Sequence, residues 1–497
     1  ASHNDKLARV AALRPAPSKS VRAWKRESPI APPEGDELAQ LLGAAVARNR
    51  YGEHLLVRQW YSTPEPCVPT PHALRLFLPP KPEQKAAMLE RLTDTGQWLF
   101  LDIETTGIAG GTGTYAFLVG IAWWEAGGLQ VEQFFMRDYT QEHSLLLEVS
   151  RRLAERGVLV TFNGKSFDWP LLETRYLMTR SISPRPPATH LDLLHPARQL
   201  WRLRLGSVRL TELERHVLGP DHLGWDRRDD IDSALIPQVY FDYLHGGPME
   251  RLRSVFRHNQ LDLRGLAALA ARMLALLSAP ETAGEETHAL ELYGLSRLLS
   301  RRGQESKARL LYERALGAGL PIEVECLARR ELARLAKRGR DFARANALWE
   351  ELACHSVHLR RSPPRHAAPL QQGKGTTVRG LNHALETSLE AYEQLAIYYE
   401  HHSREPSRAT ELTREALEKL RRGVRSSRIE FGPSRRWEAR LEHRLARLAR
   451  SAKTREARPL FDSASAEANS QARESNPRSR SRGHTSSRLR DSSAIAG

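Results

Sequence analysis

Apolar and polar residues alternate with clear structural periods between residues 97 and 277. An apolar strand is predicted at about 97–104, and two further runs, Ala116–Trp124 and Leu129–Met136, flank Gly127-Gly128, which favours a tight hairpin. The pattern continues with a helix at about 141–155, a strand at Val158–Phe162, a helix at about 169–180, a strand at His190–Leu194, a capping box at Thr211–Glu214 whose helix ends near Gly219, and helices at about 235–245 and 250–277. Three hairpin-linked strands followed by alternating helices and strands predict an α/β domain with a mixed sheet flanked by helices.

The regions around this domain have other patterns. Within the lead-in that precedes it we expect a short helix at Glu37–Ala47 and a strand at His54–Gln59, followed by prolines that interrupt regular structure. The chain is therefore divided into a disordered basic arm at 1–35, a lead-in packed on the next domain at 36–95, the α/β domain at 96–278, an all-α helical domain at 285–450, and a disordered basic tail at 451–497.

The helical domain has a weak internal repeat. Its pattern of small, large and small residues at positions 0, +4 and +7 resembles the second helix of a tetratricopeptide repeat, whose period is ~34 residues. The three copies are Ala308-Tyr312-Ala315, Ala345-Trp349-Leu352 and Ala409-Thr413-Ala416. A generic antiparallel helical domain explains the pattern nearly as well. Under both interpretations the expected role is packing or the binding of a protein partner.

The charge balance changes the expected partners. Lys and Arg total 75 against 59 for Asp and Glu, a net charge of +16 and a pI near 10.0. Such an excess favours a polyanion such as nucleic acid, although a source that favours Arg would produce the same balance. The tail, with Arg478-Ser479-Arg480-Ser481-Arg482, is expected to contact phosphates without sequence preference or to remain solvated.

Cysteine use and hydropathy indicate the compartment. The three cysteines lie far apart and form no Cys-x-x-Cys pair, which argues against a disulfide framework or a structural zinc site. No apolar run approaches the ~18 residues needed to cross a bilayer, so we expect no membrane association. A reducing, cytoplasmic location is predicted. The alternative for the basic arm, a transit peptide, is the weaker interpretation.

Candidate chemistry lies at the end of the first predicted strand. Asp102 and Glu104 are spaced i, i+2, which places both side chains on one face of a strand. Two adjacent buried carboxylates are costly unless a cation compensates their charge. Oxygen ligands suit Mg²⁺ or Mn²⁺, so the pair predicts a divalent metal site. The alternative is a strand end whose acids reach solvent.

Several ordered motifs in this region resemble those of a known family. Leu101–Gly107, Phe162–Asp168 and His258–Asp262 resemble the three motifs of the DEDD 3′–5′ exonucleases, which share a ribonuclease H-like fold. The Gly-rich connection Gly107–Phe117 and the segment Ile236–Leu244 are similar to the YprB-type branch in particular. The resemblance covers roughly 97–277. It implies a ribonuclease H-like domain and hydrolysis of nucleic acid.

The resemblance implies roles for five side chains. Asp102, Glu104, Asp168 and Asp262 would hold two Mg²⁺ or Mn²⁺ ions, and His258 would be the general base. For Asp168 a helix N-cap is a compatible alternative, because Pro170 suits the first turn behind it. His258 departs from the family, in which a His five positions or a Tyr four positions before the last Asp is usual. A neutral imidazole near its ordinary pKa could still accept a proton.

Other polar residues have a lesser place in this prediction. Thr105, Asn163 and Lys165 are candidates for nucleic-acid contacts, and Asp192 is expected to support the site. The acidic cluster Asp229, Asp230 and Asp232 is expected to be solvated. Gly110–Thr114 lacks the Gly-Lys-Ser/Thr ending of a phosphate-binding loop, so its backbone is expected to bend close to the active-site strand.

The sequence therefore predicts a metal-dependent 3′–5′ exonuclease-like hydrolase that acts on DNA or RNA by a two-metal mechanism. The alternative is a helical-repeat interaction scaffold whose ribonuclease H-like domain binds nucleic acid without cleaving it. The presence of all four carboxylates favours the enzyme, and the unusual position of His258 favours the scaffold.

Overall fold

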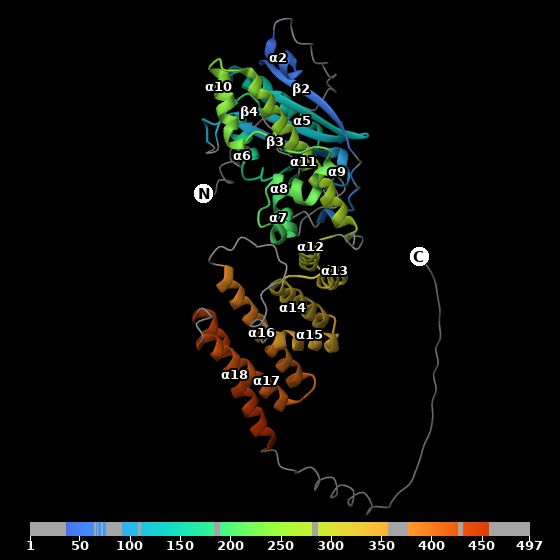
Figure 1. Cartoon of the computed structure of the whole chain (residues 1–497), viewed down its shortest axis with the longest axis vertical. Coiled ribbons are helices and arrows are strands. Elements are labelled where there is room, and N and C mark those ends of the chain that lie inside the picture. The colour runs from blue at the N-terminus through green and yellow to red at the C-terminus, as the bar shows by residue number, and fades with distance from the viewer. Residues whose placement is uncertain are drawn as a thin grey trace, which may run out of the picture. The chain divides into compact units, whose positions relative to one another are not determined.

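A computed structural model describes residues 36–63, 66, 68–70, 73–75, 92–107, 111–182, 189–280, 287–355, 376–425 and 431–456. It divides into two compact units, Ala1–Leu320 and Pro321–Gly497 (Figure 1). The predicted disordered arm and most of the predicted disordered tail lie outside the described residues. No helix in the described ranges combines the length and the apolarity needed to cross a membrane.

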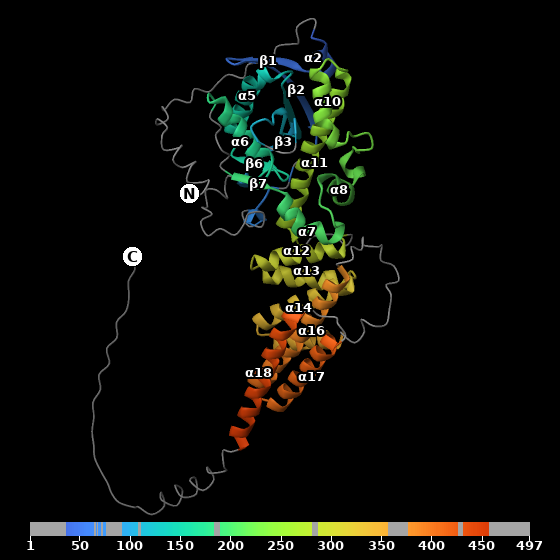
Figure 2. The same ribbon diagram turned by 90° about the vertical axis from the view of Figure 1, so that its left-hand side faces the viewer.

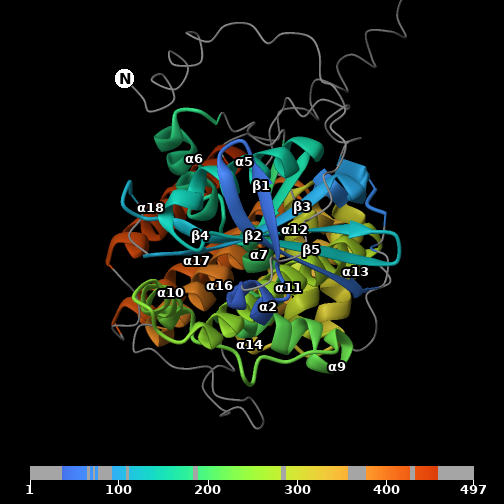
Figure 3. The same cartoon turned by 90° about the horizontal axis from the view of Figure 1, so that it is seen from above.

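The first unit is built on one seven-stranded sheet with the order β1-β2-β5-β4-β3-β6-β7. Figure 3 views its strands β1 to β5 from above. β3 lies inside the sheet, pairs antiparallel with β4 and parallel with β6, and begins the alternating part of the chain as predicted. The predicted mixed sheet flanked by helices is confirmed. The strands are β1 (Ala45–Asn49), β2 (Gly52–Ser62), β3 (Trp98–Thr105), β4 (Ala116–Glu125), β5 (Gly128–Phe135), β6 (Val158–Thr161) and β7 (Thr189–Asp192).

The lead-in contributes two strands of this sheet, which differs from the prediction for its first part. We expected a helix over Glu37–Ala47, but α2 covers only Glu37–Leu42. Gly43, at φ 62°, adopts the left-handed conformation that ends a helix, and residues from Ala45 onward pair with β2 instead. The lead-in therefore extends the sheet beyond β5.

Helices cover both faces of the sheet. On β5 the adjacent residues Glu132 and Gln133 point to opposite faces. Glu132 pairs with Arg152 of α5, whereas Gln133 bonds to Asn259 of α11, so α5 and α11 lie on opposite faces (Figure 2). The longer helices of these layers are α5 (Glu142–Glu155), α6 (Asp168–Thr179), α7 (Leu194–Leu205), α10 (Ile236–Leu244) and α11 (Leu252–Ser278).

The predicted capping box at Thr211–Glu214 is wrong. The helix α8 (Leu210–Leu213) begins before Thr211, with Arg209 at its N-cap and no side-chain cap. It continues as a π-helical turn, Glu214–Leu218. The Glu214 carboxylate cannot reach back to the helix start, because it accepts hydrogen bonds of 2.5 and 2.7 Å from Arg227.

The helical region forms antiparallel pairs. The predicted small–large–small residues are buried, and each copy lies on the second helix of a pair: α12 with α13, α14 with α15, and α16 with α17. The first pair belongs to the first unit, where α12 contacts α7. The helices are α12 (Ala289–Arg301), α13 (Glu305–Gly317), α14 (Ile322–Arg338), α15 (Phe342–His355), α16 (Thr376–His401), α17 (Pro406–Arg425) and α18 (Phe431–Glu456).

Candidate active site

Asp102 and Glu104 face the helix α11. In the sheet register Asp102 lies opposite Gly120, which lies opposite Gln133, so these residues share a face. Gln133 donates to Asn259 of α11 at 2.8 Å, which identifies that face. Glu104, two residues further along the strand, points the same way. The i, i+2 spacing therefore has the geometric consequence that the sequence predicted.

Asn259 of α11 forms a hydrogen bond with Asp102 of β3. Its Nδ2 donates to Asp102 Oδ2 at 2.8 Å, while its Oδ1 accepts from Gln133. This close approach requires a glycine on β4. A Cβ at Gly120 would lie 2.1 Å from Asn259 Oδ1 and 2.8 Å from Leu263 Cδ1. The absence of a side chain at this position thus sets how near α11 comes to β3.

Asp168 is presented by a tight turn after β6. Asn163 has φ 69° in this turn, and Asp192 at the end of β7 accepts from the backbone amides of Asn163 (2.8 Å) and Lys165 (3.1 Å). Asp192 thus supports the turn, as expected. Asp168 is the first residue of α6 and not its N-cap, which is Phe167. Its carboxylate is buried and accepts a hydrogen bond from the backbone of Ile103, the residue after Asp102.

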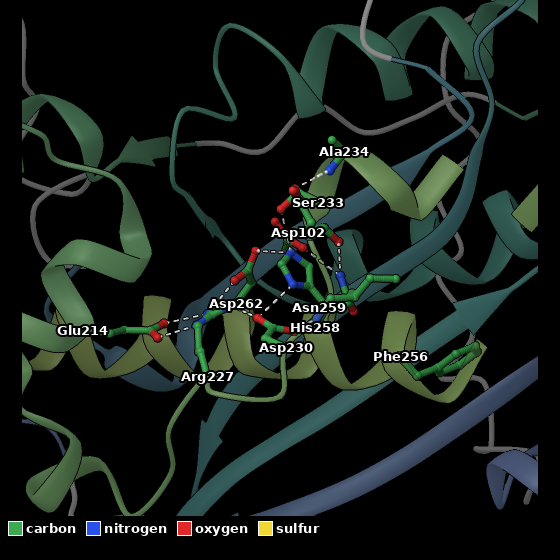
Figure 4. Close-up of polar contacts among 12 residues, drawn as sticks. Asp102, Glu214, Arg227, Asp230, Ser233, Ala234, Phe256, His258, Asn259 and Asp262 are labelled. Atoms are coloured by element: carbon green, nitrogen blue, oxygen red, sulfur yellow. Dashed lines mark hydrogen bonds and ion pairs between the residues drawn. The ribbon is translucent and has the colours of Figure 1, made fainter. Parts of the chain in front are cut away.

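Asp262 and His258 lie one turn apart on α11. They contact Arg227 and Asp230, which belong to the loop before α10 (Figure 4). Arg227 donates to Asp262 Oδ1 at 2.5 Å, and His258 Nε2 lies 3.6 Å from Asp262 Oδ2. His258 Nδ1 lies 3.0 Å from Asp230 Oδ2. Asp262 therefore faces two cationic groups.

Three carboxyl groups around β3 have raised pKa values. Burial, together with the charges of Asp262, Glu104 and Asp168, raises the pKa of Asp102 well above its usual range. Burial outweighs the nearby His258 cation and raises the pKa of Glu104 to about 8. Burial also raises the pKa of Asp168 to about 7, although backbone hydrogen bonds lower it. Groups perturbed in this way are typical of functional sites.

His258 has the opposite perturbation. Burial lowers its pKa, but the hydrogen bond to Asp230 and the charges of Asp262 and Glu104 outweigh burial and raise the pKa to about 9. The ring is therefore an imidazolium at neutral pH in this arrangement. This differs from the neutral imidazole that we expected, because the sequence did not reveal Asp230 as its partner.

The donor set suits a divalent cation. Carboxylate oxygens are the ligands that Mg²⁺ and Mn²⁺ prefer, and the raised pKa values indicate that a cation there would be stabilising. As they stand, however, no three His, Cys, Asp or Glu side chains of the described residues form a group that could hold a metal ion. Asp262 in particular is bonded to Arg227, so ligation calls for side-chain rotation.

The candidate nucleic-acid contacts differ in their availability. Thr105 is buried and its hydroxyl donates to the Gly107 carbonyl at 2.9 Å, so that hydroxyl is engaged within the loop. Asn163 and Lys165 have exposed side chains on the turn that leads to Asp168. The Thr106 amide donates to the Tyr115 carbonyl at 3.0 Å, so the two ends of the connection between β3 and β4 pair with each other.

Sequence reasoning missed several polar partners of the site. We expected Asp230 to be solvated, but it bonds to both His258 and Arg227. Arg227 and Ser233 were not singled out, and Glu214 was singled out only as part of a capping box, because nothing in their sequence spacing relates them to α11. Asn259 could have been found: it precedes Asp262 by three residues, which places both on neighbouring positions of one helix surface.

Comparisons with known proteins bear on the domain that carries these residues. Residues 99–274 match the RNase_H superfamily. The chain is 32% identical over 257 residues to a protein from Bacillus subtilis (strain 168) described as uncharacterized protein YprB; the match covers 51% of this chain and 59% of that protein. The chain therefore spans less than two thirds of the relative's length.

Among solved structures, the family B DNA polymerase from the hyperthermophilic archaeon Pyrobaculum calidifontis matches with 15% identity and a TM-score of 0.28, over 41% of this chain and 29% of that one. That score is too low to establish a shared fold, so the assignment rests on the family match, YprB and the sheet. Residues 99–274 are an RNase_H-superfamily domain, and a helix-rich region follows it.

Proposed function

We propose that this protein is a metal-dependent nuclease that removes nucleotides from nucleic acid in the 3′–5′ direction. The observation that carries the proposal is the convergence of Asp102, Glu104, Asp168 and Asp262 from β3, α6 and α11, three of them with raised pKa values. The RNase_H-superfamily match supports a nuclease, and the resemblance of the motifs to DEDD exonucleases supports the direction.

In this proposal each side chain has a distinct task. Asp102, Glu104, Asp168 and Asp262 would hold two Mg²⁺ or Mn²⁺ ions, which when bound supply an activated water and neutralise charge on the phosphate. His258 would take the proton of the attacking water. Its pKa of about 9 would fall beside bound cations, because positive charge disfavours the imidazolium. Lys165 and Asn163, exposed beside Asp168, would contact the phosphate backbone.

The proposed partner is a single- or double-stranded DNA or RNA. The net charge of +16 suits a polyanion. The experiment uses the full chain with oligonucleotides labelled at the 5′ or the 3′ end, in Mg²⁺, in Mn²⁺ and in EDTA. A 3′–5′ exonuclease shortens the 5′-labelled strand stepwise and releases the 3′ label as a mononucleotide.

Asp102→Ala is the matched inactive variant for this assay. It removes one proposed ligand and relieves like-charge repulsion, so it should abolish cleavage without unfolding the protein. Cleavage in EDTA, or activity of the variant within about tenfold of the wild type, which is ~1.4 kcal/mol in the barrier, would refute the metal assignment.

A second candidate function is binding of nucleic acid without cleavage. The observation that favours it is that Arg227 and His258 already occupy the Asp262 carboxylate, and that the described residues form no preformed group of ligands. Retention of a labelled strand with no metal-dependent shortening would favour this alternative.

A further inference from the structure

Both ring nitrogens of the proposed base His258 have hydrogen-bond partners. Its Nδ1 lies 3.0 Å from Asp230 Oδ2, and its Nε2 lies 3.3 Å from the Ser233 hydroxyl. An ionised carboxylate only accepts hydrogen bonds, so Nδ1 carries a proton and donates a hydrogen bond to Asp230. This bond fixes the plane of the ring and aims Nε2 toward Asp262 and Ser233, as Figure 4 shows.

Asp230 is itself fixed in place. Arg227 Nη1 donates to Asp230 Oδ2 at 2.9 Å, and the backbone amide of Ile231 donates to its Oδ1 at 3.0 Å. The side chain of Asp230 is only 9% exposed. Both oxygens are therefore held, and the carboxylate has little freedom to turn away from the ring.

Arg227 is held in turn by Glu214, which lies in a notch of α11 at Gly265. Its Nε and Nη2 donate to the two oxygens of Glu214 at 2.5 and 2.7 Å. Glu214 can lie against α11 only because Gly265 has no side chain: a Cβ there would lie 1.9 Å from Glu214 Oε1. Glu214 begins the π-helical turn, a feature often found at functional sites.

We propose that Asp230 is the positioning residue for His258, fixed for this purpose by Arg227 and Glu214. The proposal rests on the proposed nuclease function and adds an orienting carboxylate to it. A general base is typically oriented by a third group, and the partner that orients a metal-ligating His in the same way is worth about 10–100-fold in activity. A purely structural ion pair would stabilise the fold but would not act through His258.

The experiment is a double-mutant cycle on cleavage of a labelled single strand. Asp230→Ala should lower kcat by about 10–100-fold and leave KM and the Mn²⁺ affinity unchanged. In a His258→Ala background the same substitution should change kcat by less than about twofold, since its effect passes through the missing ring. Asp230→Asn keeps the shape if Asp230→Ala fails to fold. Asp229→Asn, at the exposed neighbouring aspartate, is the matched control.

Additive losses in the cycle, or equal losses of kcat and thermal stability with no dependence on His258, would overturn the proposal. Arg227 is unsuitable as the test position because it also bonds Asp262.

Nuclear magnetic resonance of ring-labelled histidines provides a readout that needs no activity. The Nδ1–H signal of His258 is the one that is missing in His258→Gln. This signal should be present in the wild type and in Asp229→Asn, and lost in Asp230→Ala. An unchanged signal in Asp230→Ala would refute the positioning role. Absence of wild-type cleavage with this signal pattern intact would refute the nuclease function alone.

Discussion

Replacing Glu104 by Gln should stabilise the metal-free protein in a way that grows with pH. The pKa of Glu104 is raised from 4.5 to about 8 because the group is buried among carboxylates. The folded state then binds the proton more tightly than the unfolded state, so the wild type loses stability as the pH rises through this range. Gln has nearly the same shape and cannot ionise, so the variant escapes this loss.

The magnitude follows from the two pKa values. Linkage gives a cost of about 1.4 kcal/mol at pH 5.5 and about 4 kcal/mol at pH 8, so the variant should gain about 3 kcal/mol on the wild type between these pH values. His258, with a pKa raised to about 9, keeps most of its charge across this range in the wild type.

The assay is urea unfolding in EDTA at both pH values, followed by the fluorescence of the buried sheet tryptophans Trp98 and Trp124. Glu125→Gln, at the exposed end of β4, controls for the loss of a surface charge. Adding Mn²⁺ at pH 8 should stabilise the wild type more than Glu104→Gln, because the variant has lost a ligand. A stability difference between Glu104→Gln and the wild type that is the same at both pH values would refute the reasoning.

Three further results are expected. Gly120→Ala should cost about 1–3 kcal/mol of stability and lower cleavage at least tenfold, because the new methyl group pushes Asn259 off Asp102; Gly113→Ala, where nothing lies within 4 Å, is its control, and a fully active Gly120→Ala would contradict this account. His258→Ala should lower the cleavage rate about 10²–10⁴-fold while Mn²⁺ binding persists, and near-normal turnover would remove His258 from the mechanism. Deleting residues 451–497 should weaken nucleic-acid binding and flatten its salt dependence, by about 0.7–0.9 in slope for each phosphate that the tail neutralises, and an unchanged slope would show that the tail neutralises none.

The sheet and its chemical face follow from local sequence patterns. A strand has a side-chain period of two, so Asp102 and Glu104 had to share a face once the segment was a strand. A helix brings residues four apart together, so His258 and Asp262 had to be neighbours on α11. These relations depend only on backbone periods. They predicted the domain class and the Asp102–Glu104 pair, whereas Asp168 and Asp262 became candidates through the resemblance of their motifs to a known family.

Local signals failed where a tertiary partner competed for the same group. Thr211 to Glu214 has the spacing of a capping box, but Glu214 gains more from the buried Arg227 than from a helix end. The predicted helix over Glu37–Ala47 stops at Gly43 because the following residues gain sheet hydrogen bonds with β2. A sequence pattern shows a group's local options and not the distant partner that changes the choice.

The environment of His258 was decided only by the tertiary structure. Asp230 is 28 residues from His258 in sequence, and Arg227 is 35 residues from Asp262. No backbone period relates such positions; the folded loop before α10 and the notch at Gly265 bring them together. The sequence determined which residue types could carry the chemistry, because that depends on their functional groups. Their charge states were decided by the fold, because a pKa depends on burial and on which charges lie within a few ångströms.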